Sequence, residues 1–135
     1  MTVAGAAGTT PRLLLDTHVF LWWAEGDVRR IKPATRDVIA ATASIHVSYA
    51  SAWELAVKRA LKKMHLSVTF ARALEINNFS ALPITLEHVE RVASLPPHHG
   101  DPFDRMLVVQ AQHEGLMLVT HDDVIGRYDV PVLRA

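Results

Sequence analysis

The sequence predicts an α/β protein, a three-layer α/β/α sandwich in which helices cover both faces of a central, mainly parallel sheet. Apolar runs without alternation, at residues 13–15 and 116–120, are typical of parallel strands buried on both faces. Segments with helical periodicity separate these runs, and strands that alternate with helices indicate a parallel sheet. The chain has 135 residues, half of them hydrophobic, and is long enough to bury such a core.

Start and stop signals place the elements in order along the chain. The predicted strands are apolar or β-branched segments bounded by polar residues, at 13–15, 45–49, 81–84, 116–120 and 130–133. The predicted helices begin after capping residues or at proline and end at glycine, asparagine or before proline. They cover 17–23, 34–43, 51–64, 67–78, 85–94 and 102–115.

The composition excludes several kinds of site. The chain has no cysteine, so it has no disulfide, thiolate zinc site or cysteine nucleophile. Its formal net charge is zero, so any contact with nucleic acid depends on a local basic patch. No apolar run approaches the roughly 20 residues of a membrane span. We expect a flexible tail over residues 1–11, which lacks signal-peptide features, and a single cytoplasmic domain over 12–135 without membrane contact.

Four carboxylates are expected at one edge of the predicted sheet. Asp16 and Asp122 follow apolar strands, and Glu54 is placed in the first turn of the helix after the second strand. Asp104 lies in the first turn of the helix that Pro102 opens, where it can face the same edge. The carboxyl ends of parallel strands share one edge of the sheet, and ligands bind there.

Such a group of acids needs a partner. Two carboxylates about 4 Å apart repel by roughly 4 kcal/mol at an effective dielectric constant near 20. A ring of four is tolerable if some bind protons or if a cation neutralises them. Oxygen ligands suit Mg²⁺ or Mn²⁺, ions that activate water and stabilise charge on a phosphate. The sequence therefore predicts a divalent-metal site for hydrolysis.

Each acid also has a purely structural explanation. Asp101 followed by Asp104, and Ser51 followed by Glu54, resemble the capping boxes that stabilise helix starts. Asp16 can cap the helix that follows it, and Glu54 can form an ordinary surface pair with Lys58. The two remaining acids, Asp122 and Asp123, can be turn residues. These explanations do not account for the common position of the acids at one edge.

Four segments resemble the PIN domain, and within it the VapC toxins of bacterial type II toxin–antitoxin pairs. They are LLLDTHVFLWW at 13–23, SAWELAVK at 51–58, HGDPFDRMLVVQA at 99–111 and GLMLVTHDD at 115–123. The third segment is the most specific, and the order of the four strengthens the match. The resemblance covers residues 13–133.

The resemblance implies an α/β/α sandwich, Mg²⁺- or Mn²⁺-dependent ribonuclease activity, a homodimer and a small VapB-type antitoxin that blocks the site. The residues that match the family's four acids, both as metal ligands and as catalytic residues, are Asp16, Glu54, Asp104 and Asp122. Thr120 matches the threonine of the family's T-x-D motif. Asp101 matches an acid found in a subgroup, either as a ligand or as a cap, and Asp123 is a further candidate. Many relatives carry Ser or Asn where this chain has His18.

Several other side chains have two interpretations. A basic cluster can bind RNA phosphates or form a solvated helix face; it contains Lys58, Arg59, Lys62, Lys63 and His65. The tryptophans can line an apolar groove for a partner helix or belong to the core; they are Trp22, Trp23 and Trp53. Arg105 can pair with an acid or contact substrate. The eight histidines lack metal-ligand spacing, so no zinc site is predicted, and no phosphate-binding glycine motif indicates a nucleotide cofactor.

The preferred hypothesis is therefore an endoribonuclease, the toxin of a toxin–antitoxin pair, with an RNA substrate and Mg²⁺ or Mn²⁺ as cofactor. One alternative is an inactive PIN-like module that binds nucleic acid or protein. Another is a DNA-directed nuclease with the same edge chemistry.

Overall fold

One five-stranded sheet forms the centre of the computed structural model, which describes residues 11–135. Its strands are β1 (Arg12–Leu15), β2 (Ser44–Ser48), β3 (Ser80–Leu82), β4 (Met117–Thr120) and β5 (Val132–Arg134). The strand order is β3-β2-β1-β4-β5, and every neighbouring pair is parallel. The predicted tail lies outside the described residues except for its last one, and the predicted domain range remains a prediction.

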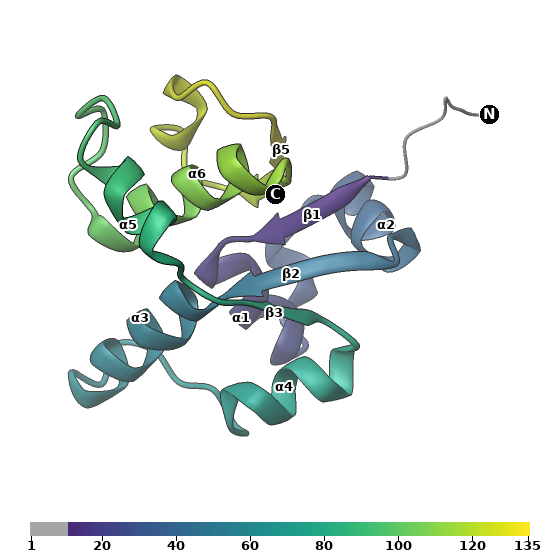
Figure 1. Cartoon of the computed structure of the whole chain (residues 1–135). Coiled ribbons are helices and arrows are strands. Elements are labelled where there is room, and N and C mark those ends of the chain that lie inside the picture. The colour runs from purple at the N-terminus through teal and green to yellow at the C-terminus, as the bar shows by residue number, and fades with distance from the viewer. Residues whose placement is uncertain (1–10) are drawn as a thin grey trace.

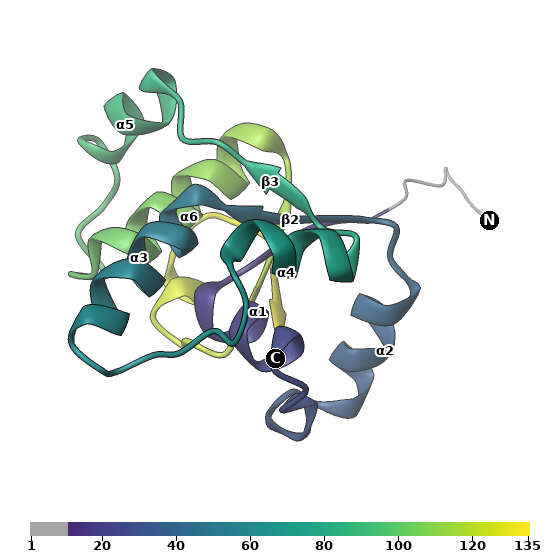
Figure 2. The ribbon, with the colours of Figure 1, turned by 90° about the horizontal axis from the view of Figure 1, so that it is seen from below.

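Helices cover both faces of the sheet, which confirms the predicted sandwich (Figure 1). They are α1 (Thr17–Ala24), α2 (Pro33–Ala41), α3 (Tyr49–Ala60), α4 (Phe70–Asn77), α5 (Leu86–Val92) and α6 (Pro102–Glu114), with short 3₁₀ turns at Val28–Arg30 and Ile125–Arg127. Figure 2 shows α1, α2 and α4 on one side of the sheet, and Figure 1 shows α5 and α6 on the other. Within residues 11–135, no helix has the length and apolar character needed to cross a bilayer.

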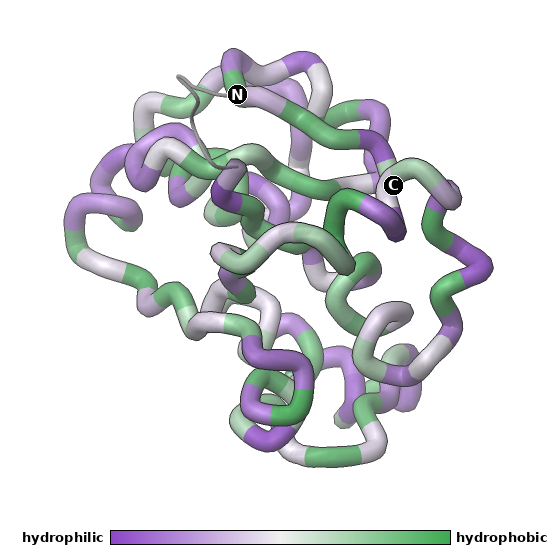
Figure 3. Tube along the Cα trace, turned by 90° about the vertical axis from the view of Figure 1, so that its right-hand side faces the viewer, coloured by the Kyte–Doolittle hydropathy of each residue, from purple (hydrophilic) through white to green (hydrophobic). Residues whose placement is uncertain are grey.

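The apolar runs supply both cores. On β1, Leu13 and Leu15 pack in the core beneath α1, α2 and α4, whereas Leu14 packs in the core that includes α6. All three leucines are fully buried because each face of the central strand meets a helical layer. Hydrophobic residues accordingly run along the inner strands, and hydrophilic ones are common on the outer loops (Figure 3).

The start of α3 corrects one prediction. The side chain of Ser48, not that of Ser51, caps this helix by accepting a hydrogen bond from the N–H of Ala50. Ser51 is instead fully buried and accepts a 2.9 Å hydrogen bond from the hydroxyl of Thr17. The proposed capping box of Ser51 and Glu54 is therefore wrong, because Glu54 lies well beyond the first turn.

The end of α3 also differs from its predicted position. The helix ends at Ala60 rather than at Met64, and Lys62 adopts a left-handed conformation with φ of 60°. The chain then returns to the core, where Met64 and Leu66 are buried. The residues at this turn are good helix formers, so burial of the two apolar side chains decides where the helix stops.

The next helix, α4, starts after Thr69 rather than at Ser67, which binds Glu25 instead. Other element ends lie within a few residues of their predicted positions.

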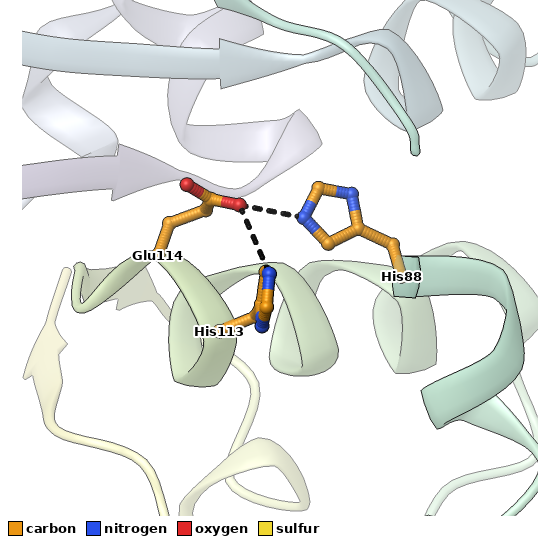
Figure 4. A group of neighbouring side chains, drawn as sticks. All are labelled: His88, His113 and Glu114. Carbon is orange, nitrogen blue, oxygen red and sulfur yellow. Dashed lines mark hydrogen bonds and ion pairs between the residues drawn. The ribbon is translucent and has the colours of Figure 1, made fainter. Parts of the chain in front are cut away.

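A buried histidine joins α5 to α6 (Figure 4). Nδ1 of His88 accepts a hydrogen bond from the N–H of Thr85, completing a capping box at the start of α5. The proton of the neutral ring therefore lies on Nε2, which donates to Glu114 at 2.9 Å. His113 also approaches Glu114, at 3.9 Å, and it lies 3.1 Å from Glu87. Because Nε2 donates, this group is a hydrogen-bond network that holds two helices together.

We expect His88→Ala to lower the free energy of unfolding by about 2–4 kcal/mol, because it removes a buried cap and leaves a cavity. His113→Ala is the matched control: His113 is partly exposed, and its loss should cost less than about 1 kcal/mol. Urea unfolding of both variants measures the difference. Equal losses in the two variants would contradict the role assigned to His88.

Candidate active site

The four predicted acids meet in one pocket of about 240 Å³ at the carboxyl edge of the sheet. Asp16 directly follows β1, and Asp122 follows β4. Asp104 stands in the first turn of α6, and Glu54 reaches the pocket from the middle of α3, which packs against α6. The pocket is also lined by His18, Lys58, His99, Asp101 and His121. Sequence reasoning therefore identified the acids that come together, although not the local geometry of Glu54.

Thr120 connects two of these acids. Its hydroxyl donates to Oδ2 of Asp16 at 2.5 Å and accepts from the N–H of Asp122 at 3.0 Å. The other oxygen of Asp16 accepts from the N–H of Val19, so this carboxylate also caps α1. Asp16 and Thr120 are almost fully buried. The capping and pocket roles of Asp16 therefore coexist in one side chain.

His99 connects Asp122 to Asp104 and was missed as a site residue. Its Nδ1 accepts from the N–H of Asp101 at 3.0 Å, so the proton of the neutral ring lies on Nε2. Nε2 lies 2.8 Å from Oδ2 of Asp122 and 3.2 Å from Oδ2 of Asp104. The ring thus holds two carboxylates that would otherwise repel each other.

Glu54 is 3 % exposed and pairs with Lys58, whose ammonium lies 2.8 Å from Oε2. The bond to Glu54 raises the pKa of Lys58, and the charges of Asp101 and Asp104 act in the same direction. Oε1 of Glu54 is buried and has no hydrogen-bond partner among the residues described. Lys58 therefore forms the predicted pair with Glu54 and lines the acidic pocket, unlike the other members of the predicted basic cluster.

The electrostatics of the pocket reflect burial of like charges. Burial raises the pKa of Asp104 to about 7, and the neighbouring charges of Asp101, Asp16 and Glu54 add to the shift. Burial also raises the pKa of Asp16, although the hydrogen bond from Thr120 opposes it. For Asp122, burial acts upward, but hydrogen bonds from His99 and from a backbone N–H hold its pKa below the usual value. Repulsion and burial therefore disfavour full ionisation of these carboxylates, and a bound cation would stabilise their charged forms.

The donor set fits Mg²⁺ or Mn²⁺. Carboxylate oxygens are the ligands that these ions favour. The unpartnered Oε1 of Glu54 is a buried acceptor that leaves one hydrogen-bonding position unfilled. The raised pKa of Asp104 is a second sign that the group lacks positive charge.

Asp101 is a helix cap that also lines the pocket. Its Oδ1 accepts from the N–H groups of Phe103 and Asp104 at 2.8 and 3.2 Å. The predicted cap is therefore confirmed. Asp123, by contrast, is 82 % exposed, does not line the pocket and pairs with Arg134.

Arg105 contacts no carboxylate among residues 11–135, so the predicted pairing with an acid is wrong. Its guanidinium donates to the backbone carbonyls of four residues and to the hydroxyl of Tyr128; the four are Val92, Leu95, Pro96 and His99. These oxygens satisfy its donors. Arg105 therefore braces the segment that carries His99.

The remaining candidates separate into different surfaces. Arg59, Lys62, Lys63 and His65 line one pocket at the end of α3, and Lys58 is not among its lining residues. Trp53 is 59 % exposed and lines an apolar groove of about 170 Å³ between α3, α5 and α6. Trp22 and Trp23 are partly buried against the core. Trp53 therefore lines an apolar groove, as one interpretation predicted. Trp22 and Trp23 fit the core interpretation only in part, because their side chains are partly buried.

Comparisons with known proteins agree with this geometry. A curated relative, ribonuclease VapC22 of Mycobacterium tuberculosis, is 28 % identical over 113 residues, covering 82 % of this chain and 86 % of that protein. The fold resembles DNA-bound VapBC from Salmonella typhimurium (TM-score 0.64, 16 % identity, covering 92 % of this chain and 98 % of the other). It also resembles VapBC2 from Rickettsia felis bound to a promoter DNA fragment (TM-score 0.62, 12 % identity, 90 % and 97 % covered). Since the PIN domain family model matches residues 13–131, nearly the whole described chain, the protein belongs to the PIN domain family and is distantly related to the VapC toxin ribonucleases.

Proposed function

We propose that this protein is a metal-dependent endoribonuclease, the toxin of a type II toxin–antitoxin pair, acting in the cytoplasm. The observation that carries the proposal is the convergence of Asp16, Glu54, Asp104 and Asp122 in one pocket, with an unpartnered oxygen on Glu54. Membership of a family whose nucleases typically use divalent metals supports it. The presence of all four acids favours an active enzyme over an inactive binding module.

The four acids would hold Mg²⁺ or Mn²⁺ and also act as the catalytic residues. When bound, such an ion supplies a Lewis acid that lowers the pKa of water and neutralises charge on the phosphodiester. Thr120 fixes the orientation of Asp16, and the imidazole of His99 fixes Asp122 and Asp104. Residues that orient metal-binding side chains in this way commonly matter for affinity by about 10- to 100-fold.

Lys58 supplies the positive charge nearest to Glu54. When substrate occupies the pocket, its ammonium can bind a non-bridging phosphate oxygen as a strong charge-assisted donor. Asp101 keeps the start of α6 in place, so that Asp104 stays directed toward the pocket.

The test is cleavage of single-stranded and structured RNA, and of matched DNA, by the purified protein with Mg²⁺, with Mn²⁺ and with EDTA. We expect cleavage of RNA but not of DNA, dependence on either metal, and no cleavage in EDTA. Cleavage of DNA alone would support the DNA-nuclease alternative. Absence of cleavage with either nucleic acid under all metal conditions would support the inactive-module alternative.

The three cations that line the pocket at the end of α3 are proposed to bind RNA phosphates. They are Arg59, Lys62 and Lys63, called the surface basic cluster below. Replacing all three with glutamate should weaken RNA binding and flatten its dependence on salt, by about 0.7 in log–log slope for each phosphate that the protein no longer binds. Fluorescence anisotropy over a range of KCl concentrations measures the slope. The matched control is Arg29→Glu, a change of charge on an exposed side chain that lines none of the pockets around the site. A slope equal to that of the parent would show that the cluster is only a solvated helix face.

The partners proposed for this chain are a VapB-type antitoxin and a second copy of itself. Its structural neighbours are VapBC complexes, which supports the antitoxin. Exposed apolar side chains on α3 and α5 offer surface for a protein interface; they are Tyr49, Trp53, Val57, Leu86 and Val89, with Leu61 just beyond the end of α3. Co-purification with the product of a short neighbouring reading frame tests the antitoxin, and the mass in solution of the chain alone tests the homodimer.

A further inference from the structure

Three rings form a cluster at the rim of the acidic pocket. The centroid of His121 lies 4.9 Å from that of Trp22 and 5.4 Å from that of His18. His18 and Trp22 are 5.8 Å apart. Two of the three, His18 and His121, also line the acidic pocket, and Nδ1 of His121 is 3.9 Å from Oδ2 of Asp16. The cluster thus places aromatic surface directly beside the acids.

A second pocket, of about 320 Å³, is also lined by His18. This volume is in the range of small-molecule sites. Trp22 and Arg30 line it, and the Arg30 guanidinium carbon lies 5.9 Å from the centre of the Trp22 ring. His18 is the wall that the two pockets share. A molecule that extends out of the acidic pocket past His18 therefore enters this second pocket.

The charges around the second pocket nearly cancel. The cations are Arg30 and Lys63, and the acids are Glu25 and Asp27. Asp27 pairs with Arg30 and Arg29, and Glu25 accepts hydrogen bonds from the backbone and hydroxyl of Ser67. Such a pocket suits an uncharged planar group better than a phosphate.

Positive charge continues beyond this pocket. Lys63 and His65 line both the second pocket and the pocket of the surface basic cluster. A nucleic-acid strand alternates charged phosphates with uncharged bases. Such a strand could place a phosphate at the acidic pocket, the next base at the aromatic rings and a further phosphate near the cations. Unpaired bases of RNA stack on aromatic side chains and are recognised in this way in many proteins.

We propose that Trp22, with His18 and His121, binds one unpaired nucleobase of single-stranded RNA next to the phosphodiester that is cleaved. This inference rests on the proposed ribonuclease function and names the substrate as RNA that is unpaired at this position. The groove around Trp53 differs, because its lining is formed almost entirely by apolar side chains and includes no charged residue. That lining has no cationic side chain that could bind the phosphates on either side of the base.

The test compares Trp22→Leu with the parent on short single-stranded RNAs, intact or lacking one base at successive positions. Binding is measured by anisotropy in the Asp16→Asn background, so that the RNA stays uncut. Trp22→Leu should weaken binding of intact RNA by about 5- to 100-fold, the range expected for loss of one base–aromatic stack. One abasic RNA should bind the Trp22-containing protein weakly and show no further loss with Trp22→Leu.

Two further variants separate stacking from structural damage. Trp22→Phe keeps an aromatic ring and should restore most of the affinity. Trp23→Leu makes the same change at the neighbouring position on α1, which lines neither pocket, and should bind as the parent does. Melting curves confirm that each variant is folded.

An equal loss with Trp22→Leu on intact RNA and on every abasic RNA would overturn the stacking assignment. Affinity unchanged by Trp22→Leu would also overturn it. In the otherwise unchanged protein, Trp22→Leu should raise KM for single-stranded RNA more than it lowers kcat. If the parent protein cleaves RNA and Trp22→Leu binds RNA as tightly as the parent does, only the stacking inference is refuted. A parent that cleaves no RNA would refute the proposed function itself.

Discussion

Asp104→Asn is expected to raise the melting temperature of the protein in EDTA at pH 8 and to reduce its gain in stability from Mn²⁺. The pKa of Asp104 is raised to about 7 in the folded state, mainly by burial and then by neighbouring carboxylates. A raised pKa means that the folded protein binds a proton more readily than the unfolded chain. The stability associated with this group is therefore present at low pH and is lost as pH rises from about 4 to about 7.

The size of this loss is up to roughly 4 kcal/mol, from the difference between the two pKa values. Asparagine cannot ionise, so the variant avoids the loss, although it gives up about 0.3–1 kcal/mol of favourable interaction with the helix start. The net gain at pH 8 should be about 3 kcal/mol, and it should shrink toward zero or change sign near pH 4.

Mn²⁺ should stabilise the variant much less than it stabilises the parent. Ligand binding stabilises the folded state by RT ln(1 + [L]/Kd), so loss of one carboxylate ligand reduces the gain. Melting curves at pH 5 and pH 8, each with EDTA and with Mn²⁺, measure both effects. Asp123→Asn is the matched control, because this acid is exposed, lies outside the pocket and should change neither. If Asp104→Asn melts lower than the parent in EDTA at pH 8 and gains equally from Mn²⁺, then Asp104 is only a helix-start residue.

Asp16→Asn is expected to abolish RNA cleavage while the fold survives. The carboxylate is 3 % exposed and lies between Thr120 and the N–H of Val19. Asparagine is as good a helix cap as aspartate, and its carbonyl oxygen can still accept from Val19. The substitution therefore removes one negative charge from the acidic pocket and leaves the start of α1 intact.

The loss of activity should be about 100-fold or more, the scale observed when a group that stabilises transition-state charge is removed. Single-turnover cleavage of RNA with Mn²⁺ measures it, and circular dichroism checks the fold. Asp123→Asn, prepared in the same way, should cleave as the parent does and so controls for activity lost during preparation, whereas absence of cleavage by Asp16→Asn excludes a contaminating nuclease. Cleavage by Asp16→Asn at the parental rate would mean that the acids do not form the active site.

Local sequence was sufficient for the fold class and for the choice of acids. The run of three leucines before Asp16 predicted a strand with helices on both faces. A strand with one solvated face would alternate apolar and polar residues, and this run does not. Once the strands are parallel, the residues after them must share one edge. Asp16, Glu54 and Asp122 were placed from this rule, Asp104 was placed from the start of its helix, and all four line the pocket.

Tertiary structure alone decided how the pocket is built. Glu54 was predicted in a first turn and instead reaches the acids from the middle of α3, because Ser48 caps the helix. Lys58 is adjacent to other basic residues in sequence, yet its ammonium faces the acidic pocket, where opposite charge is concentrated. Helix spacing predicted the pairing of Lys58 with Glu54, but the burial of that pair beside the other acids depends on the neighbouring elements.

The contacts of His99 and Arg105 show the same division. The sequence showed a histidine two residues before a helix cap, with no sign that Asp122, on a different element, would lie 2.8 Å from its ring. Arg105 was expected to pair with an acid or to contact substrate, but its guanidinium donates to four backbone carbonyls. Hydrophobic periodicity is a local property and therefore determines elements and their buried faces. The partner of a polar side chain is set by the nearest unsatisfied group after packing, and that group can lie far away in sequence.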